Sequence, residues 1–478
     1  MENFCVRDIV NATNGRLLCG DENTAIINFA TNSGKSEPGL MFAPIVGERV
    51  DGHKYIANAF ECGASGTLTQ NEAAVADIID RWKSTGEAAK PVILVDDSVK
   101  AMQLTAREYE SRLSLDKVGV TGSVGKTTTK EMIACALSGG LKVYKTAGNA
   151  NSQIGVPVTI MNIKPDDEAA VIEMGMSEEG EMKRLAALLT LDAAVMTNIG
   201  VSHIEQLGSQ ENILAEKWHI TDALKDGGFI FLNGDDVLLR ERARLCKESH
   251  DEVFGAEDTR RLTVYTFGHA EDCDYRAENI VTDGDGISFD AVHAGERLHV
   301  KLAVLGDHNV NNALVALAVA QHFGVDIQSA ADELKGYTGV AMRQHVTKKD
   351  GITYIDDSYN ASPDSMKAGL NVLCQMPASY RVAVLADMLE LGENTKEYHR
   401  LVGEYAGKSK VDELVLYGEL AKNIGYGAEQ YIKNIRHFDT LDEIKSYLKN
   451  SLKPGTAVLF KGSRGMRLNE AADGILEA

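Results

Sequence analysis

The sequence predicts an α/β protein of three domains, and three observations support this prediction. The chain has 478 residues, too many for one compact core. From Lys117 onward, short apolar segments alternate with helical patterns, which predicts a mostly parallel sheet with helices on both faces. The same alternation restarts near Arg343. We therefore expect an N-terminal α/β domain (1–113), a central domain (114–341) and a second complete α/β domain (342–478).

The N-terminal region mixes short apolar strands with helices. Strands are expected over 39–46 and 91–96, and a helix over 55–62 follows a turn at Asp51. A charged helix over 99–113 leads away from this region, and the first domain boundary follows it.

The central region begins a longer alternation. Its expected elements are a helix over 126–138, strands over 142–145 and 169–172, a helix from residue 178, a strand over 193–196, a helix over 209–225 and a strand over 229–232. Residues 264–305 differ, because short alternating runs around 283–286 predict antiparallel hairpins. A helix that begins at Asp307 closes the domain.

The C-terminal region repeats the strand and helix order. Strands are expected over 352–355, 382–385, 414–417 and 457–460, and helices over 363–375, 395–408 and 441–452.

The composition is that of an ordinary soluble globular protein, with 44% apolar and 25% charged residues. The first residues lack a signal-peptide pattern, and the longest apolar run, 313–320, is too short to span a bilayer. A net charge of −21 argues against a nucleic-acid partner. Seven scattered cysteines without a C-x-x-C pair predict reduced thiols, not a zinc site or a disulfide framework. We therefore expect a cytoplasmic protein.

The stretch from Val118 to Met132 has the pattern of a phosphate-binding turn: an apolar strand, a glycine-rich turn and a helix. In such turns backbone N–H groups surround phosphate oxygens, a lysine meets the terminal phosphates and a threonine ligates Mg²⁺. Val120 stands where the general pattern has glycine, so only a shorter form is present. A turn without a ligand is the alternative. The expected nucleotide-binding residues are Gly122, Ser123, Val124, Gly125, Lys126, Thr127 and Thr128.

Two further strand ends carry polar residues. Glu173 ends one buried strand, and the segment 197–203, which ends in His203, follows the next. Ligands bind beyond the carboxyl ends of such strands, so both residues would face the phosphate loop if the strands are close in the sheet. The alternative for Glu173 is a solvated carboxylate that binds no ligand, and the alternative for His203 is a structural histidine. Lys217 has the pattern of a solvated helix lysine.

Polar clusters also occur later in the chain. Asn309 and Asn312 share a helix face, so both amides could contact one ligand, for example an adenine edge. The segments 355–363 and 461–465 place acids, a tyrosine, an asparagine and basic residues at strand ends. With Arg343 at the domain junction, these loops could form a second wall of the site. For each loop alone, an ordinary polar turn is the alternative.

Together these segments resemble the Mur ligase family, ATP-dependent amide-forming enzymes of peptidoglycan synthesis. The motifs that carry the resemblance are 121–128, Glu173, 198–203, Lys217, 308–312 and Arg343. Within the family, the segments 148–157, 356–363, 386–392 and 461–464 are most similar to the ligases that join D-alanyl-D-alanine to UDP-N-acetylmuramoyl-tripeptide.

The resemblance implies an N-terminal domain that binds the UDP-sugar, a central ATP-binding domain and a Rossmann-like C-terminal domain that closes over ATP and binds the incoming dipeptide, in a monomer. It implies catalytic roles for Lys126, His203, Lys217 and Arg343. It implies two Mg²⁺ ions, one held by Thr127 and Glu173 and the other by His203 and a carbamylated Lys217. Asn309, Asn312, Arg343 and Asp357 would contact the nucleotide, and the expected substrate contacts are Asn149, Asn151, Asp356, Tyr359, Asn360, Lys461, Ser463 and Arg464.

Two segments depart from the family pattern. Ser362 stands where asparagine is usual, and Thr31–Lys35 replaces an Asp-Ser-Arg segment, with Lys35 in place of the arginine after a shift of one residue. The rival hypotheses are another Mur ligase, a folylpolyglutamate-type ligase, a P-loop GTPase switch and a non-catalytic nucleotide-binding regulator. A GTPase is disfavoured because the chain has no Asn-Lys pair, which guanine-reading motifs usually contain.

Overall fold

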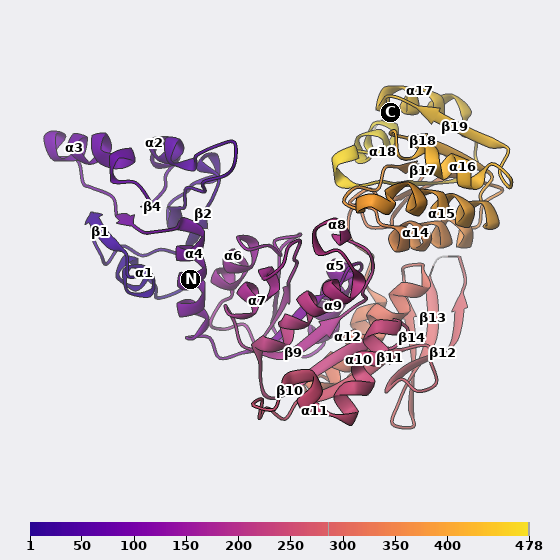
Figure 1. The fold of residues 1–478 in the computed structure, drawn as a ribbon, viewed down its shortest axis with the longest axis horizontal. Coiled ribbons are helices and arrows are strands. Elements are labelled where there is room, and N and C mark those ends of the chain that lie inside the picture. Colours follow the sequence, from indigo (N-terminus) through magenta and orange to yellow (C-terminus); the bar gives the residue numbers. More distant parts are fainter. Residues whose placement is uncertain (285, 477–478) are drawn as a thin grey trace.

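The computed structural model describes residues 1–284 and 286–476. Its strands form three separate sheets, one in each part of the chain where the sequence predicts a domain. Figure 1 shows the N-terminal sheet at one end, the C-terminal sheet at the other and the central sheet between them. Within the described residues no helix is long and apolar enough to cross a membrane.

The N-terminal sheet has five strands in the order β1-β5-β4-β3-β2. Only β1 runs antiparallel to its neighbour. The strands are β1 (Arg16–Cys19), β2 (Asn28–Ala30), β3 (Leu40–Phe42), β4 (Gly66–Thr69) and β5 (Val92–Leu94), and the helices are α1 (Val6–Thr13), α2 (Ile56–Glu61), α3 (Ala76–Thr85) and α4 (Ser98–Glu110).

Helix α4 joins this sheet to the central one. Its N-terminus is capped by Asp97, which accepts a hydrogen bond from the backbone N–H of Lys100 at 2.7 Å. Near its other end, the buried Tyr109 hydroxyl donates to the carbonyl of Ile163 at 2.8 Å. The helix also packs against α6 (Gly155–Asn162), so the N-terminal and central sheets are connected by packing as well as by the chain.

The central sheet has nine strands in the order β14-β13-β12-β11-β10-β9-β6-β8-β7. Strands β6 to β12 pair in parallel, and β12, β13 and β14 pair antiparallel. The strands are β6 (Asp116–Thr121), β7 (Val143–Lys145), β8 (Ala169–Glu173), β9 (Leu191–Met196), β10 (Leu224–Asn233), β11 (Thr263–Gly268), β12 (Tyr275–Thr282), β13 (Ile287–His293) and β14 (Glu296–Leu302).

Helices lie on both faces of this sheet. They are α5 (Lys126–Leu137), α6, α7 (Glu181–Ala186), α8 (Ile204–Leu207), α9 (Gln210–Trp218), α10 (Val237–Glu248), α11 (His250–Phe254), α12 (Asp307–His322) and α13 (Ile327–Lys335). Helix α12 packs against α5 and is buried continuously from Asn312 to Ala320. A helix that is apolar on nearly every side needs such a covered position.

The register of the central strands sets the position of the site. All residues of β8 and β9 are buried, as expected of strands in the middle of a parallel sheet. Val120 of β6 pairs with Glu173 of β8 on one side and with Val195 of β9 on the other. The carboxyl ends of the three strands therefore meet at one edge, so the loop after β6, Glu173 and the segment after β9 are neighbours.

The C-terminal sheet has six strands in the order β15-β16-β20-β17-β18-β19, and only β15 is antiparallel. The strands are β15 (His345–Lys349), β16 (Ile352–Asp356), β17 (Tyr380–Ala386), β18 (Glu413–Tyr417), β19 (Asn434–Phe438) and β20 (Thr456–Lys461). The helices are α14 (Pro363–Gln375), α15 (Thr395–Lys408), α16 (Lys422–Ala428), α17 (Leu441–Ser451) and α18 (Asn469–Leu476).

Two predicted elements are wrong in part. The helix expected over 209–225 ends at Trp218, a 3₁₀ helix follows over His219–Ala223 and β10 begins at Leu224. The His219 ring lies 2.7 Å from the carboxylate of Asp222, a contact that suits a 3₁₀ turn because side chains three residues apart eclipse there. The hairpins expected over 264–305 begin only at β12, because β11 is parallel to β10. The turn expected at 283–286 includes residue 285, which lies outside the described residues.

The first turn of α14 explains the unusual residue at position 362. Ser362 is the N-cap, and its hydroxyl accepts from the N–H of Ser365 at 3.4 Å, while the Ser365 hydroxyl accepts from the N–H of Ser362 at 2.8 Å. Serine and asparagine are both good N-caps. Ser362 can therefore replace the usual asparagine without loss of the helix start.

We expect Ser362→Ala to lower the free energy of unfolding by about 1 kcal/mol, because the first turn then loses its cap. Ser362→Asn should keep wild-type stability. The midpoints of thermal unfolding of the two variants measure the difference. Equal midpoints for alanine and asparagine would show that the cap contributes nothing.

Candidate active site

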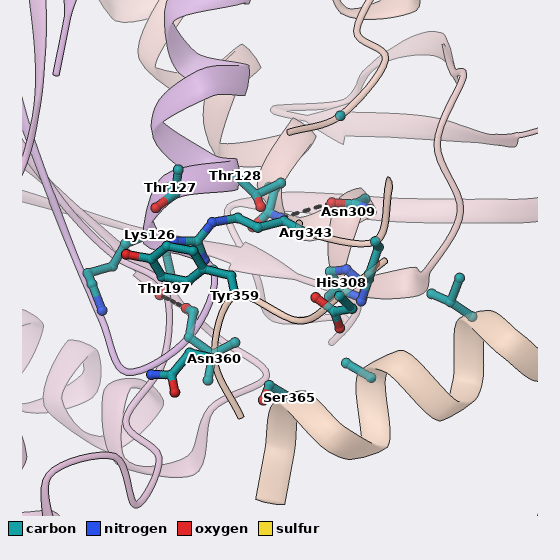
Figure 2. A pocket seen from close by; sticks show the side chains of 18 of the residues that line it. Lys126, Thr127, Thr128, Thr197, His308, Asn309, Arg343, Tyr359, Asn360 and Ser365 are labelled. Carbon is teal, nitrogen blue, oxygen red and sulfur yellow. Dashed lines mark hydrogen bonds between the residues drawn. The ribbon is translucent and has the colours of Figure 1, made fainter. Parts of the chain in front are cut away.

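A cavity of about 800 Å³ lies between the central and C-terminal sheets. Figure 2 shows Lys126, Arg343 and Tyr359 close together in it, with His308 and Asn309 nearby. The predicted site residues that line it are Ser123, Val124, Gly125, Lys126, Thr127, Thr128, Asn151, Glu173, His203, Asn309, Asn312, Arg343, Asp357, Tyr359, Asn360 and Lys461. Six other predicted residues are absent from the cavity wall: Gly122, Asn149, Lys217, Asp356, Ser463 and Arg464.

The loop between β6 and α5 requires glycine at two positions. Gly122 has φ +145°, and a Cβ atom there would lie 1.9 Å from Oγ1 of Thr197. Gly125 has φ +87° and is the N-cap of α5, in the left-handed region that favours glycine. The loop therefore takes a shape that leaves the N-terminus of α5 directed at the cavity, the arrangement that binds anions.

Lys126 is folded over this loop. Its ammonium donates to the carbonyl of Gly122 at 2.7 Å and approaches that of Ser123 at 3.4 Å. Removal from water lowers the pKa of Lys126, Glu173 acts in the opposite direction, and Arg343 lowers the pKa further. An anion in the cavity would stabilise both cations.

Glu173 is fully buried at the end of β8. Its Oε1 accepts from the Thr127 hydroxyl at 3.1 Å and from Nδ2 of Asn151 at 2.6 Å. Its Oε2 accepts no hydrogen bond from any of the described residues, and the ammonium of Lys130 lies 3.8 Å away. The structure thus brings together the threonine and the acid that the sequence predicts as ligands of one cation.

His203 lies beyond β9 with a left-handed backbone, φ +64°. Its Nδ1 lies 2.9 Å from Oε2 of Glu390 in the C-terminal part, without hydrogen-bond geometry. Burial lowers the pKa of His203 to about 4, and Lys126 and Lys217 add to this effect. At neutral pH the ring is therefore uncharged, the form of histidine that binds metals.

Lys217 is wholly buried in α9, contrary to the solvated lysine that its sequence pattern indicates. Among residues 1–284 and 286–476 its ammonium has no carboxylate within 4.0 Å and no hydrogen-bond acceptor. Burial and the charge of Lys126 hold the pKa of Lys217 well below its usual range, despite the neighbouring Glu216. The Glu216 carboxylate is occupied elsewhere, because it accepts from the N–H groups of Gly180 and Met182 at 2.8 and 2.7 Å.

Asn309 and Asn312 join α12 to the phosphate-loop helix. Nδ2 of Asn312 donates to Oδ1 of Asn309 at 3.1 Å, and Oδ1 of Asn312 accepts from the Thr129 hydroxyl at 2.8 Å. Nδ2 of Asn309 donates to the carbonyl of Leu305 at 2.7 Å. Both amides line the cavity, and internal hydrogen bonds fix their orientation.

Two arginines contact one tyrosine at the C-terminal wall. The guanidinium of Arg343 lies 4.0 Å from the ring centroid of Tyr359, and that of Arg464 lies 5.0 Å from it. Arg343 itself stands between Met342 and Gln344, which both have left-handed φ angles of +60° and +55°. The ring of Tyr359 therefore connects the interdomain junction to the loop after β20.

We expect Tyr359→Leu to lower kcat/KM of the ATP-dependent reaction that the sequence resemblance implies by about tenfold, since two cation–π contacts are lost. Tyr359→Phe keeps the ring and should stay near wild type. Steady-state rates with ATP varied, and then with the amine substrate varied, measure both variants. If phenylalanine is as impaired as leucine, the hydroxyl and not the ring carries the role.

Lys461 is a buried residue of the cavity wall that the C-terminal part forms. Its ammonium donates to Oδ2 of Asp357 at 2.7 Å and to the carbonyl of Asn360 at 3.1 Å. Burial raises the pKa of Asp357, and Lys461 and then Arg343 oppose this shift. Asp356 and Ser463 also make hydrogen bonds within the C-terminal part. Asp356 accepts from the N–H of Ser358, and the Ser463 hydroxyl accepts from the N–H of Leu389.

Models of two domain families match the chain: the Mur ligase middle domain over residues 120–320, and the Mur ligase, glutamate ligase domain over residues 342–464. A relative from Bacillus subtilis (strain 168), named UDP-N-acetylmuramoyl-tripeptide–D-alanyl-D-alanine ligase, is 35% identical over 478 residues and covers 99% of this chain and 98% of the relative. The chain belongs to the Mur ligase family. Members of this family form amide bonds at the expense of ATP, so the prediction of an ATP-dependent ligase is confirmed.

Other relatives of this ligase agree. One from Escherichia coli (strain K12), with the same name, is 28% identical and covers 100% of this chain and 99% of its own. A crystal structure of MurF from Acinetobacter baumannii superposes with a TM-score of 0.86 at 25% identity, over 99% of both chains. MurF ligase from Thermotoga maritima, solved in complex with ADP, gives a TM-score of 0.78 at 29% identity, over 95% of this chain and 97% of that one. The predicted three-part α/β fold class is therefore confirmed.

The ligase's phosphate loop also fits a nucleotide-bound Mg²⁺ ion. Mg²⁺ is usually held by one or two carboxylates together with substrate phosphates and water, not by a cage of protein ligands. Among the residues that the structure describes, no three His, Cys, Asp or Glu side chains converge as such a cage. The buried carboxylate of Glu173, beside the Thr127 hydroxyl and with one oxygen that accepts no hydrogen bond from the described residues, suits this mode of binding.

Two residues that brace the phosphate loop were absent from the predicted site. Oδ1 of Asn198 accepts from the N–H of Val124 at 2.8 Å, and its carbonyl accepts from the N–H of Ser123 at 3.0 Å. The Thr197 hydroxyl donates to the carbonyl of Val124 at 2.5 Å. Their position in the motif with His203 is the signal that could have identified them, but only the strand order shows that they contact the loop.

Proposed function

We propose that this Mur ligase joins D-alanyl-D-alanine to UDP-N-acetylmuramoyl-tripeptide with hydrolysis of ATP to ADP and phosphate. The observation that carries the proposal is the convergence of the phosphate loop, Glu173 and His203 in one cavity, facing loops of the C-terminal part. Relatives that match nearly the whole chain bear the name of this activity. The motif segments 356–363 and 386–392 also favour it over other amide ligases.

In the proposed site, Lys126 and the N–H groups of Gly122 to Thr128 bind the terminal phosphates of ATP. Thr127 and Glu173 would hold one Mg²⁺, and His203 and Lys217 would hold a second. Such ions would supply positive charge next to the transferring phosphoryl group. Asn309 and Asn312 contact adenine, and Arg343 and Asp357 reach the nucleotide from the opposite wall.

A carbamate on Lys217 would make this lysine a metal ligand. The neutral amine adds CO₂ and releases a proton, which leaves an anionic carbamate in place of a cation. The low pKa of Lys217 and the lack of an ionic partner among the described residues support this proposal, since only a neutral amine reacts with CO₂. A nearby metal ion would stabilise the new negative charge.

The reaction proceeds in two steps in this proposal. The terminal carboxylate of the tripeptide attacks the γ-phosphorus of ATP, which gives an acyl phosphate and ADP. The amine of D-alanyl-D-alanine then attacks the acyl carbon, loses a proton and expels phosphate. Lys126 and Arg343 stabilise negative charge during phosphoryl transfer, and closure of the C-terminal part keeps water from the acyl phosphate.

We assign the substrates to the two outer parts of the chain. The proposed domains are 1–113 for the UDP-sugar, 114–341 for ATP and 342–478 for the dipeptide, in a monomeric cytoplasmic enzyme. Seven free cysteines are in keeping with a reducing compartment. The proposed substrate contacts are Asn149, Asn151, Asp356, Tyr359, Asn360, Lys461, Ser463 and Arg464.

Phosphate release in the presence of ATP, Mg²⁺ and UDP-N-acetylmuramoyl-tripeptide tests this function. Release that depends on D-alanyl-D-alanine, with the UDP-pentapeptide product detected by mass spectrometry, is the expected result. Release with glutamate or a single amino acid in its place would identify a different amide ligase. Nucleotide binding without phosphate release from any peptide acceptor would overturn the proposal.

A further inference from the structure

Lys130 is a buried lysine in the stretch from Val118 to Met132, two residues beyond the last one predicted to bind the nucleotide. It lies in α5, one turn after Lys126, and its side chain is 0% exposed. Fully buried lysines are rare unless they are paired. Its ammonium lies 2.9 Å from Oε1 of Glu131 and 3.8 Å from Oε2 of Glu173. The second of these carboxylates belongs to the cavity.

The same ammonium also holds the loop after β7. It donates to the carbonyls of Thr146 at 2.7 Å and of Gly148 at 3.1 Å. The Thr146 hydroxyl accepts from the backbone N–H of Glu173 at 3.0 Å. Three residues past Gly148, Asn151 donates to Oε1 of Glu173 at 2.6 Å. Lys130 is therefore connected to Glu173 directly and through two positions of one loop.

We propose that Lys130 is a positioning residue that holds the Glu173 carboxylate and the loop 146–151 in place for the divalent cation that accompanies the nucleotide. This inference rests on the proposed function, which makes Glu173 a ligand of that cation. Oε2 of Glu173 accepts no hydrogen bond from the described residues, and this supports the inference, because a carboxylate placed only for stability would be expected to have both oxygens hydrogen-bonded. Lys130 itself does not touch the nucleotide in this proposal.

The direction in which cation affinity changes when Lys130 is removed distinguishes a positioning role from a purely electrostatic one. If Lys130 acted only as a positive charge near the cation, its removal would strengthen cation binding by removing a repulsion. If it positions Glu173, its removal lets the carboxylate turn toward Lys126, whose charge interacts with it, and cation binding weakens. A purely structural lysine would change stability and leave cation binding alone.

The experiment titrates Mg²⁺ into the full-length enzyme with ADP and measures binding by calorimetry. We expect Lys130→Met to raise the Mg²⁺ concentration at half-saturation by about tenfold or more, the usual effect of losing a group that supports a metal ligand. Lys145→Met is the matched control. This lysine is half exposed and pairs with Glu131, but it does not contact Glu173, so a change within about twofold is expected.

Thr146→Val is a second test that keeps the buried lysine. It removes the hydroxyl that accepts from the N–H of Glu173 and keeps the branched shape of the side chain, so a shift in the same direction is expected even if Lys130→Met fails to fold. An unchanged or lowered half-saturation in either folded variant would overturn the inference. The variant Glu173→Gln distinguishes failure of the Lys130 inference from failure of the proposed function. If Glu173→Gln leaves the Mg²⁺ titration unchanged, Glu173 is not a ligand of the cation and the metal assignment itself fails.

Discussion

Lys126→Ala is expected to lower kcat for ligation at least about a hundredfold, the effect of removing a partner of transition-state charge. The lysine lies over the phosphate loop, 2.7 Å from the carbonyl of Gly122, at the N-terminus of α5. The backbone N–H groups of the loop remain in the variant, so nucleotide binding should weaken less than turnover. Single-turnover phosphate release, with ATP at saturation, measures the loss.

Two controls make this result specific. Lys145→Ala removes a lysine that is half exposed and is not among the residues that line the cavity, and should ligate at the wild-type rate. The unfolding midpoint of Lys126→Ala should remain near wild type, because burial already disfavours the charged form of this side chain. Near-normal ligation by a folded Lys126→Ala enzyme would show that this loop is not the phosphate-binding site.

The central sheet was the most predictable part of the fold. Its inner strands β8 and β9 are buried on both faces, so they appear in the sequence as continuous apolar runs between helical patterns. The N-terminal sheet was harder, because strands such as β2 and β3 have only three residues and carry no clear periodicity. In the C-terminal sheet both edge strands, β15 and β19, were missed, since each mixes exposed with partly buried residues and carries no buried apolar run.

The site was predictable where one segment carries the chemistry. The phosphate loop and Glu173 follow from local sequence and from the rule that ligands bind at strand ends. Contacts between distant segments did not follow from the sequence. The bracing of the loop by Asn198, the shared contact of two arginines with Tyr359 and the burial of Lys461 against Asp357 all depend on the strand order.

Lys217 shows most clearly that contacts between distant segments could not be predicted from the sequence. The helix around it contains glutamates and a histidine, so its sequence pattern indicates a solvated lysine. The structure buries Lys217 because α9 packs Ile213, Leu214 and Trp218 into the hydrophobic core, and Lys217 lies between Leu214 and Trp218 on the same helix. Its pKa falls for the same reason, and a strongly perturbed pKa marks a residue as a candidate for a functional role.

Lys217→Ala is expected to abolish ligation and to regain part of it when short carboxylic acids such as acetate or formate are added. The small side chain leaves a space beside His203, and a carboxylate placed there would supply the negative charge and the oxygen ligand of the proposed carbamate. Ligation rates across a series of acids and of matched amines measure the effect. Lys126→Ala is the control, because its lost charge is positive and acids should not restore it. Rescue of Lys217→Ala by amines would mean that the lysine acts as a cation, and the carbamate would be rejected.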